Sequence, residues 1–261
     1  MEQHTSPTHR KPLNSEQLKV LDALYHFRFG TTDLLSSIMS KHTSRRFMNE
    51  RLRVLCEQEY IGRRYDSSYK LQAKFATYYL LPNGINILKQ RPGIYQPKML
   101  RNIRKDINAS DRFIEHCLNI LATFTKLKVL YGPSFTFDTK SNLSHPKFDY
   151  FPEILPDGYA TYQAKNGMQK HFMLACFDNT KPQKVLRQRI AQTIDHEYTD
   201  GWKDDETYPE ILIVCDTEVL RQKAQKWVNK IVEDEAAEGM KFYVASLPKL
   251  TVKAKAINEA A

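Results

Sequence analysis

The chain has 261 residues, a hydrophobic fraction of 41% and a net charge of +9, which fit one large or two ordinary globular domains and exclude a disordered protein. No stretch approaches the roughly 18 apolar residues that a membrane helix needs, and the polar start has no signal-peptide pattern. The four cysteines form no CxxC pair, which favours reduced thiols and argues against a zinc site. We therefore expect a cytoplasmic protein with no membrane partner.

The positive charge is concentrated in the N-terminal part of the chain. Residues 1–105 hold 19 Lys and Arg against 8 Asp and Glu, a net charge of +11, whereas the rest of the chain carries −2. A basic half joined to a nearly neutral half indicates a nucleic-acid-binding module attached to a second domain. The alternative is a solvated basic face without a partner.

The first elements in chain order are a tail and a helix. Residues 1–12 are expected to form a disordered tail. A helix should start at Asn14, because its side chain can cap the first turn and Gln17 can complete a capping box. Apolar residues at helical spacing continue to a stop near Gly30.

Two shorter helices and a hairpin are predicted next. Thr31 or Thr32 caps the second helix, and a turn at 40–43 leads to the third. Segments 60–65 and 77–81 flank a polar tip and predict a two-stranded wing, and a helix follows residues 82–84. Three helices and a hairpin in this order make a winged helix-turn-helix, here over residues 13–92. The inner face of the third helix is expected to hold Phe47 or Met48, Leu52 and Leu55.

The third helix and the wing carry the predicted DNA contacts. In such a domain the first turns of the third helix meet base edges in the major groove. Arg pairs with guanine and Asn with adenine, while basic wing residues touch phosphate. A three-helix core that binds protein is the alternative. The predicted DNA-binding residues are Lys41, His42, Ser44, Arg45, Arg46, Asn49, Arg53, Arg63, Arg64, Lys70 and Lys74.

A second domain is predicted over residues 110–250, after a basic linker at 93–109 and before a tail at 251–261. Its order is helix, three strands, helix, strand, helix, strand, which fits a restriction-endonuclease-like α/β core. Apolar patterns place helices at 110–127, 180–198 and 218–235 and strands at 129–137, 208–216 and 241–247.

Residues 151–181 contain a hairpin with the outline of a nuclease site. Strands around Tyr159 and Phe172 should turn at Asn166-Gly167, a strong hairpin signal. The endonuclease-like fold places an Asp at the start of the first strand, then a Glu and a Lys two residues apart on the next. Asp157 fills the first position, and positions 176 and 178 share one face beside it.

Cys176 stands where the Glu is expected, and Asp178 stands where many such folds place the Lys. Mg²⁺ requires hard oxygen ligands, whereas a thiolate is soft. We therefore expect a remnant site of Asp157, Cys176 and Asp178 with no catalytic residue, no metal and no cofactor. Mg²⁺ is the expected cofactor only if Glu115 or Glu153 completes the site.

Several motifs resemble the replication-relaxation family, which includes MobC-type plasmid relaxases. The resemblance covers roughly residues 13–232 and implies a winged helix followed by an endonuclease-like domain. It identifies Asp157 and Asp178 as the first and last carboxylates of the family's site, while Cys176 departs from the pattern and puts cleavage in doubt. The matching motifs are NSEQLKVLDAL, RRFMNERLRVLCEQEYIGRR, YYLLPNGINIL, His116, LPDGYA, HFMLACFDNT, the helix with Tyr198, and ILIVCD.

The sequence thus predicts a sequence-specific double-stranded-DNA-binding protein of a plasmid or other mobile element, acting in replication, mobilisation or regulation. Its inert nuclease-like domain would serve dimerisation or the binding of replication or mobilisation proteins. The first alternative is an active metal-dependent nickase or relaxase. The second is a protein-interaction scaffold.

Overall fold

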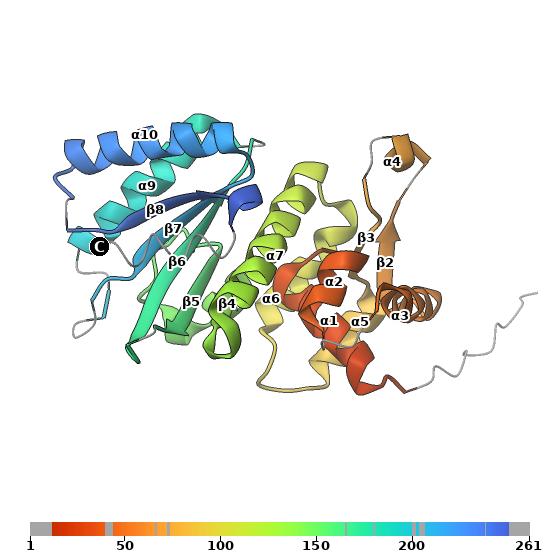
Figure 1. Cartoon of the computed structure of the whole chain (residues 1–261). Coiled ribbons are helices and arrows are strands. Elements are labelled where there is room, and N and C mark those ends of the chain that lie inside the picture. Colours follow the sequence, from red (N-terminus) through yellow and green to blue (C-terminus); the bar gives the residue numbers. More distant parts are fainter. Residues whose placement is uncertain are drawn as a thin grey trace, which may run out of the picture. The chain divides into compact units, whose positions relative to one another are not determined.

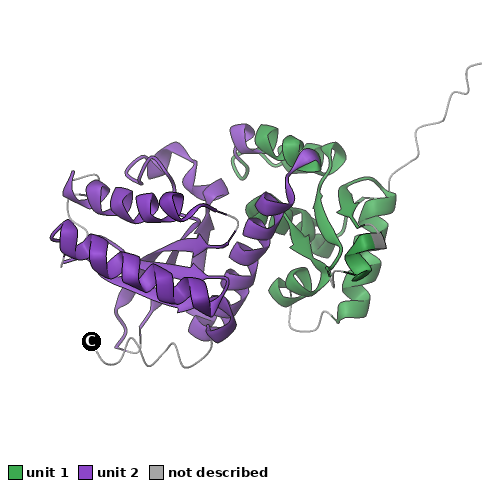
Figure 2. Cartoon of the chain, turned by 90° about the horizontal axis from the view of Figure 1, so that it is seen from above, with its two compact units in different colours: residues 1–95, 100–107 green, residues 96–99, 108–261 purple. Residues whose placement is uncertain are grey.

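The computed structural model describes residues 12–39, 44–65, 67–71, 74–164, 166–179, 181–199, 202–203, 207–237 and 239–250. The predicted tail at 251–261, the predicted tail at 1–12 except its last residue, and the predicted DNA contacts Lys41 and His42 lie outside these residues. The chain is a mixed α/β protein of two compact units, one of residues 1–95 with 100–107 and one of residues 96–99 with 108–261 (Figure 2). None of the described helices is long and apolar enough to cross a membrane.

The first unit combines helices with a three-stranded antiparallel sheet of order β1-β3-β2 (Figure 1). A short helix, α4, occupies the tip between β2 and β3. The elements are α1 (Ser15–Phe27), β1 (Gly30–Thr31), α2 (Thr32–Ile38), α3 (Arg45–Glu57), β2 (Ile61–Arg64), α4 (Ser67–Leu71), β3 (Thr77–Leu80) and α5 (Pro82–Lys89).

The predicted helix starts are confirmed by their capping side chains. The Gln17 backbone N–H donates to Asn14 Oδ1 at 2.9 Å, and the Asn14 N–H donates back to Gln17 Oε1 at 3.0 Å, which is a complete capping box. Thr31 caps α2 and Ser44 caps α3 by a single hydrogen bond each, accepted from the Leu34 and the Phe47 N–H. Of the two residues predicted for the first inner position of α3, Met48 is buried and Phe47 is 67% exposed.

The predicted hairpin is confirmed, since β2 and β3 pair antiparallel with Ile61 opposite Leu80. The prediction missed β1, whose residue Gly30 pairs with Tyr78. Two residues are too few to show the alternation that identifies a strand. Strand β1 lies in the connection between α1 and α2, so this connection forms one edge of the sheet.

The segment predicted as a linker is structured. It contains α6 (Pro97–Ile103) and a 3₁₀ helix at Arg104–Asn108. Leu100 and Ile103 are buried, and Asp106 is only 2% exposed. The Asp106 carboxylate accepts two hydrogen bonds from the Arg28 guanidinium, one of them at 2.8 Å from Nε. The basic composition of the segment concealed these buried positions.

The second unit has a five-stranded sheet of order β4-β5-β6-β7-β8, antiparallel from β4 to β6 and parallel from β6 to β8. The predicted element order is confirmed, with α8 added. The hairpin turns at Asn166-Gly167 as predicted, and Gly167 has φ 81°. The elements are α7 (Asp111–Tyr131), β4 (Thr136–Thr139), α8 (Lys140–Leu143), β5 (Gly158–Gln163), β6 (Gln169–Phe177), α9 (Gln183–Tyr198), β7 (Glu210–Cys215), α10 (Glu218–Asp234) and β8 (Phe242–Ser246).

The predicted strand at 129–137 is wrong in its first half. Helix α7 continues through Tyr131 with Leu127 and Leu130 buried, a helical spacing, and it ends at Gly132 with φ 76°. Val129 is 82% exposed on this helix. Its β-branched side chain suggested a strand, but the helical period of the leucines prevails.

Helices α9 and α10 lie along one face of this sheet, and α7 packs on the other (Figure 1). Successive β6 side chains alternate between the faces. Met173 and Phe177 belong to the core with α9 and α10, whereas Cys176 contacts Thr123 of α7. The end of β6 therefore lies between α7 and α9.

The buried pair of Arg28 and Asp106 yields a stability prediction. Arg28→Met leaves a buried carboxylate without its partner, so we expect the free energy of unfolding to fall by about 3 kcal/mol or more. Arg28→Met/Asp106→Leu removes both charges and should regain most of this loss. Urea unfolding of the two variants measures the difference, and a double variant no more stable than the single one would contradict the assignment.

Candidate functional site

Asp157 and Asp178 lie together in the second unit, joined by one histidine. Both carboxylates are 1% exposed. His116 of α7 is placed between them, with Nδ1 2.7 Å from Asp178 Oδ2 and Nε2 3.2 Å from Asp157 Oδ1. Asp157 precedes β5 and Asp178 follows β6, so the hairpin brings the two aspartates to one end of the sheet.

Basic side chains surround this pair. Lys140 Nζ lies 2.8 Å from Asp157 Oδ1, and Arg189 Nη1 lies 3.2 Å from Asp157 Oδ2. Lys181 Nζ lies 3.1 Å from His116 Nε2. We refer to the whole group as the Asp157 cluster: Asp157, Asp178, His116, Lys140, Lys181 and Arg189.

The Asp157 cluster carries an excess of positive charge. Two carboxylates face three side chains of Lys and Arg, before any proton on His116 is counted. Burial raises the pKa of Asp157, but the charges of Lys140 and Arg189 outweigh it and hold this pKa well below its usual range. Asp157 is therefore ionised at neutral pH.

His116 has hydrogen-bond partners in both of its protonation states. When both ring nitrogens carry a proton, both donate to carboxylates. When the ring is neutral, Nδ1–H donates to Asp178 and Nε2 accepts from Lys181. Burial lowers the pKa of His116, but its hydrogen bonds to Asp157 and Asp178 outweigh burial and raise the pKa above its ordinary value.

Cys176 contacts Asp157 through its backbone. Its N–H donates to Asp157 Oδ2 at 2.8 Å, whereas its Sγ lies 3.7 Å from Thr123 Oγ1 on α7. Burial raises the pKa of the thiol strongly, so the sulfur is protonated at neutral pH. A buried neutral thiol is a poor metal ligand.

The residues at this site do not fit a Mg²⁺ ion. The two oxygens of Asp157 already accept hydrogen bonds or ion pairs from His116, Lys140, Arg189 and the Cys176 N–H. Within the described ranges, no group of three or more His, Cys, Asp or Glu residues is arranged to hold a metal. Glu115 and Glu153, the residues expected to complete such a site, are both exposed.

Sequence reasoning missed Lys140, Lys181 and Arg189, and it noted His116 only as part of a family motif. One signal was available for Arg189. It falls in the apolar stripe of α9, three residues after the buried Leu186 and directly before the buried Ile190. A charged residue at such a position needs a buried partner.

The predicted DNA contacts on α3 differ in their surroundings. Arg45, Arg46 and Asn49 are exposed, and Arg45 Nε lies 3.1 Å from Asp33 of α2. Arg53 is bound on its own helix, by Glu50 at 2.9 Å and by Glu57. Ser44 caps the helix, with its Oγ accepting from the Phe47 N–H.

Two of the predicted contacts on the β2–β3 hairpin and its tip lie beside aromatic rings. The Arg63 guanidinium lies over the Tyr65 ring at 4.7 Å, and Lys74 Nζ lies 6.0 Å from the centre of the Tyr69 ring. Lys70 is exposed on α4, whereas Arg64 is half-buried. The β2–β3 hairpin and its tip thus carry cations beside aromatic rings.

The His116 contacts yield a pH prediction. The unfolded pKa of His is about 6.5. Because folding raises the pKa, the stabilisation by His116 is fully present below this value and is lost as the pH rises through the folded-state pKa. The difference in unfolding free energy between the wild type and His116→Gln, measured in urea from about pH 5 to 9, should therefore shrink as the pH rises. A difference that grows with pH would contradict this account.

Comparison with known proteins adds no relative. No family model, curated protein or solved structure matches this chain. Its function is therefore inferred from the geometry of the two units and from the sequence motifs.

Proposed function

We propose that the protein binds double-stranded DNA sequence-specifically through its first unit, acting as a winged helix-turn-helix. The observation that carries the proposal is the exposure of Arg45, Arg46 and Asn49 on the first turns of α3. These are the residue types that pair with guanine and adenine edges, at the end of the helix that enters a major groove.

The arrangement around α3 supports this role. The order α1, β1, α2, α3, β2, β3 and the sheet order β1-β3-β2 agree with a winged helix. Met48, Leu52 and Leu55 are buried on one side of α3, which leaves the opposite side polar and exposed. A helix fixed in this way presents a rigid polar face to a partner.

The wing and the net charge point to the same partner. Arg63, Lys70 and Lys74 lie on or beside the hairpin of β2 and β3. Residues 1–105 carry +11. Basic side chains on a wing suit contacts to phosphate, which add affinity without selecting a base sequence.

For the second unit we propose a nuclease-like core without metal-dependent activity, used for dimerisation or for binding replication or mobilisation proteins. The order of strands and helices supports this proposal, as does the meeting of Asp157 and Asp178 at one end of the sheet. The proposed role on a plasmid or other mobile element rests on the resemblance to the replication-relaxation family.

A metal-dependent nickase is the second candidate. Its supporting observation is that Asp157 and Asp178 lie at one end of the sheet, as two metal-binding carboxylates would. The contacts of Asp157 favour the first candidate, because Mg²⁺ would have to displace the Lys140 and Arg189 cations.

Substitutions on α3 test the proposed DNA contact. A preferred duplex site is first selected from random sequences. Binding to this duplex should weaken by about 1–3 kcal/mol for every base contact that is lost in Arg45→Ala, Arg46→Ala or Asn49→Ala. Lys70→Ala should weaken all duplexes about equally. Among the predicted contacts on this helix, Arg53→Ala should weaken binding least, because Glu50 and Glu57 already bind its side chain.

Fluorescence anisotropy at several salt concentrations provides the measurement for these variants. Affinity should fall steeply with salt for the wild type. A folded Arg45→Ala/Arg46→Ala variant that binds like the wild type would exclude α3 from the groove, and salt-independent or absent binding would favour a protein-interaction scaffold.

We further expect no Mg²⁺-dependent nicking of supercoiled plasmid by the purified protein. The Asp157 oxygens lack the free lone pairs that would bind the ion and lower the pKa of its water. Agarose gels of plasmid incubated with Mg²⁺ or Mn²⁺ provide the measurement. Robust nicking that Asp157→Asn abolishes would overturn this expectation and support the nickase.

A further inference from the structure

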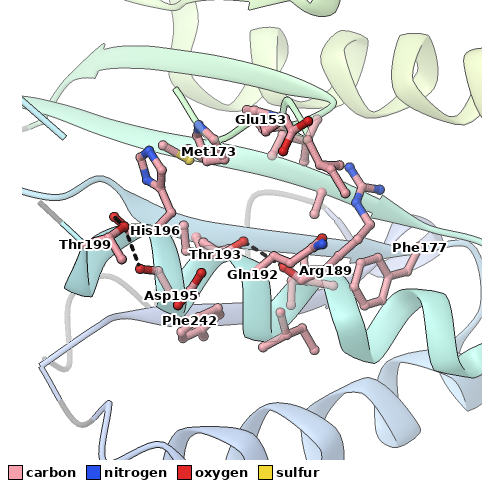
Figure 3. Close-up of a pocket in the computed structure, with 18 residues that line it drawn as sticks. Glu153, Met173, Phe177, Arg189, Gln192, Thr193, Asp195, His196, Thr199 and Phe242 are labelled. Atoms are coloured by element: carbon pink, nitrogen blue, oxygen red, sulfur yellow. Dashed lines mark hydrogen bonds between the residues drawn. The ribbon is translucent and has the colours of Figure 1, made fainter. Parts of the chain in front are cut away.

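The second unit contains a cavity of about 370 Å³ that the proposed DNA binding does not use. It lies between α9, one face of the sheet and the loop 152–156 that leads to Asp157 (Figure 3). Its volume falls within the range of about 300–1,000 Å³ that is typical of small-molecule sites.

The floor of the cavity is apolar. Met173 and Ala175 of β6, Ile211 and Ile213 of β7, and Phe242 of β8 line it. These residues belong to or pack on the core shared with α9 and α10. Such a surface suits the hydrocarbon part of a ligand, because apolar contact removes it from water.

A partly unpaired guanidinium lies at one end of the cavity. Arg189 rises from α9 towards the loop that carries Glu153 (Figure 3). Its side chain is 12% exposed, and only Nη1 has a hydrogen-bond partner among the described residues, Asp157. Because Lys140 and His116 also bind Asp157, the charge of Arg189 is only partly neutralised. An acceptor anion in the cavity would complete its hydrogen bonding.

Gln192, one turn further along α9, supplies a second unmet contact. Its Oε1 is buried without a hydrogen-bond partner in the described part of the chain, and the residue lines the cavity. A buried acceptor of this kind gains stability from any N–H that reaches it. The ligand therefore needs a donor near its anionic end.

Three further polar groups of the cavity restrict the charge of the ligand. Glu153 and Asp195 line the cavity and are exposed, so they repel a polyanion at its mouth. His196 lies near Met173 at the end away from Arg189 (Figure 3), and its Nδ1 is 3.1 Å from the Tyr208 hydroxyl. Burial lowers the pKa of His196, so its imidazole is neutral at pH 7.

We propose that this cavity binds a small monoanionic carboxylate with an apolar body and an N–H group near the carboxylate. The carboxylate pairs with Arg189, the N–H donates to Gln192, and the apolar body lies on the floor of β6, β7 and β8. This binding site is independent of the proposed DNA contact.

Calorimetric titration of the whole protein with N-octanoylglycine tests the proposal, because this probe carries all three features. Its methyl ester, which lacks the charge, should bind at least about tenfold more weakly. Inorganic phosphate, which lacks the apolar body, should not compete at millimolar concentration. An absence of binding by the acid, or equal binding by the ester, would overturn the proposal.

Variants locate the site. Arg189→Lys keeps a cation beside Asp157 but loses the planar pair of donors, so binding should weaken about tenfold. Gln192→Leu should also weaken it, whereas Gln188→Leu, an exposed position on the same helix, is the matched control. Ala175→Leu fills the cavity and should abolish binding in a folded protein.

Two results would reject the cavity as the site. One is equal binding by Ala175→Leu and the wild type, each shown to be folded by its thermal transition. The other is that duplex DNA displaces the probe both from the wild type and from Lys70→Ala. Such displacement would mean that the cavity itself contacts nucleic acid.

Discussion

The second unit depends on compensation of one buried charge, the carboxylate of Asp157. An ionised carboxylate that is 1% exposed is tolerated only where opposite charges and hydrogen-bond donors replace its water. The donors come from four elements: His116 of α7, Lys140 of α8, the Cys176 N–H of β6 and Arg189 of α9. Asp157 thereby joins the start of β5 to both faces of the sheet.

The same contacts determine what this site can do chemically. A metal-dependent nuclease needs carboxylate oxygens that are free to bind the ion, whereas those of Asp157 are occupied by cations and a backbone N–H. Cys176 offers a neutral buried thiol where an oxygen ligand is expected. The cations that compensate Asp157 therefore stand against the metal-dependent proposal, and we assign the proposed DNA recognition to the first unit.

Local features of both units could be predicted from the sequence. The capping box of Asn14 and Gln17 and the turn at Asn166-Gly167 are specified by neighbouring residues, and both are confirmed. The strand predicted at 129–137 is wrong in its first half. The β-branched Val129 favours a strand, but Leu127 and Leu130 have the spacing of a helix. Strand β1 was missed because two residues carry no period.

The Asp157 cluster itself could be predicted only in part. Asp157 and Asp178 were identified from the hairpin, but Lys140, Lys181 and Arg189 reach them from separate elements. Arg189 lies 32 positions along the chain from Asp157. Only the fold shows that these basic residues compensate the carboxylates.

The thermal stability of Asp157→Asn, measured with and without Mg²⁺, tests this central claim most directly. Carboxylates that are clustered to hold a metal repel one another when the metal is absent. If Asp157 belonged to such a site, Asp157→Asn would be more stable than the metal-free wild type, and Mg²⁺ would stabilise the wild type. If basic side chains compensate Asp157, the variant should lose about 3 kcal/mol or more and Mg²⁺ should leave the wild-type melting temperature unchanged. A stabilised variant together with a wild type that Mg²⁺ stabilises would contradict the account.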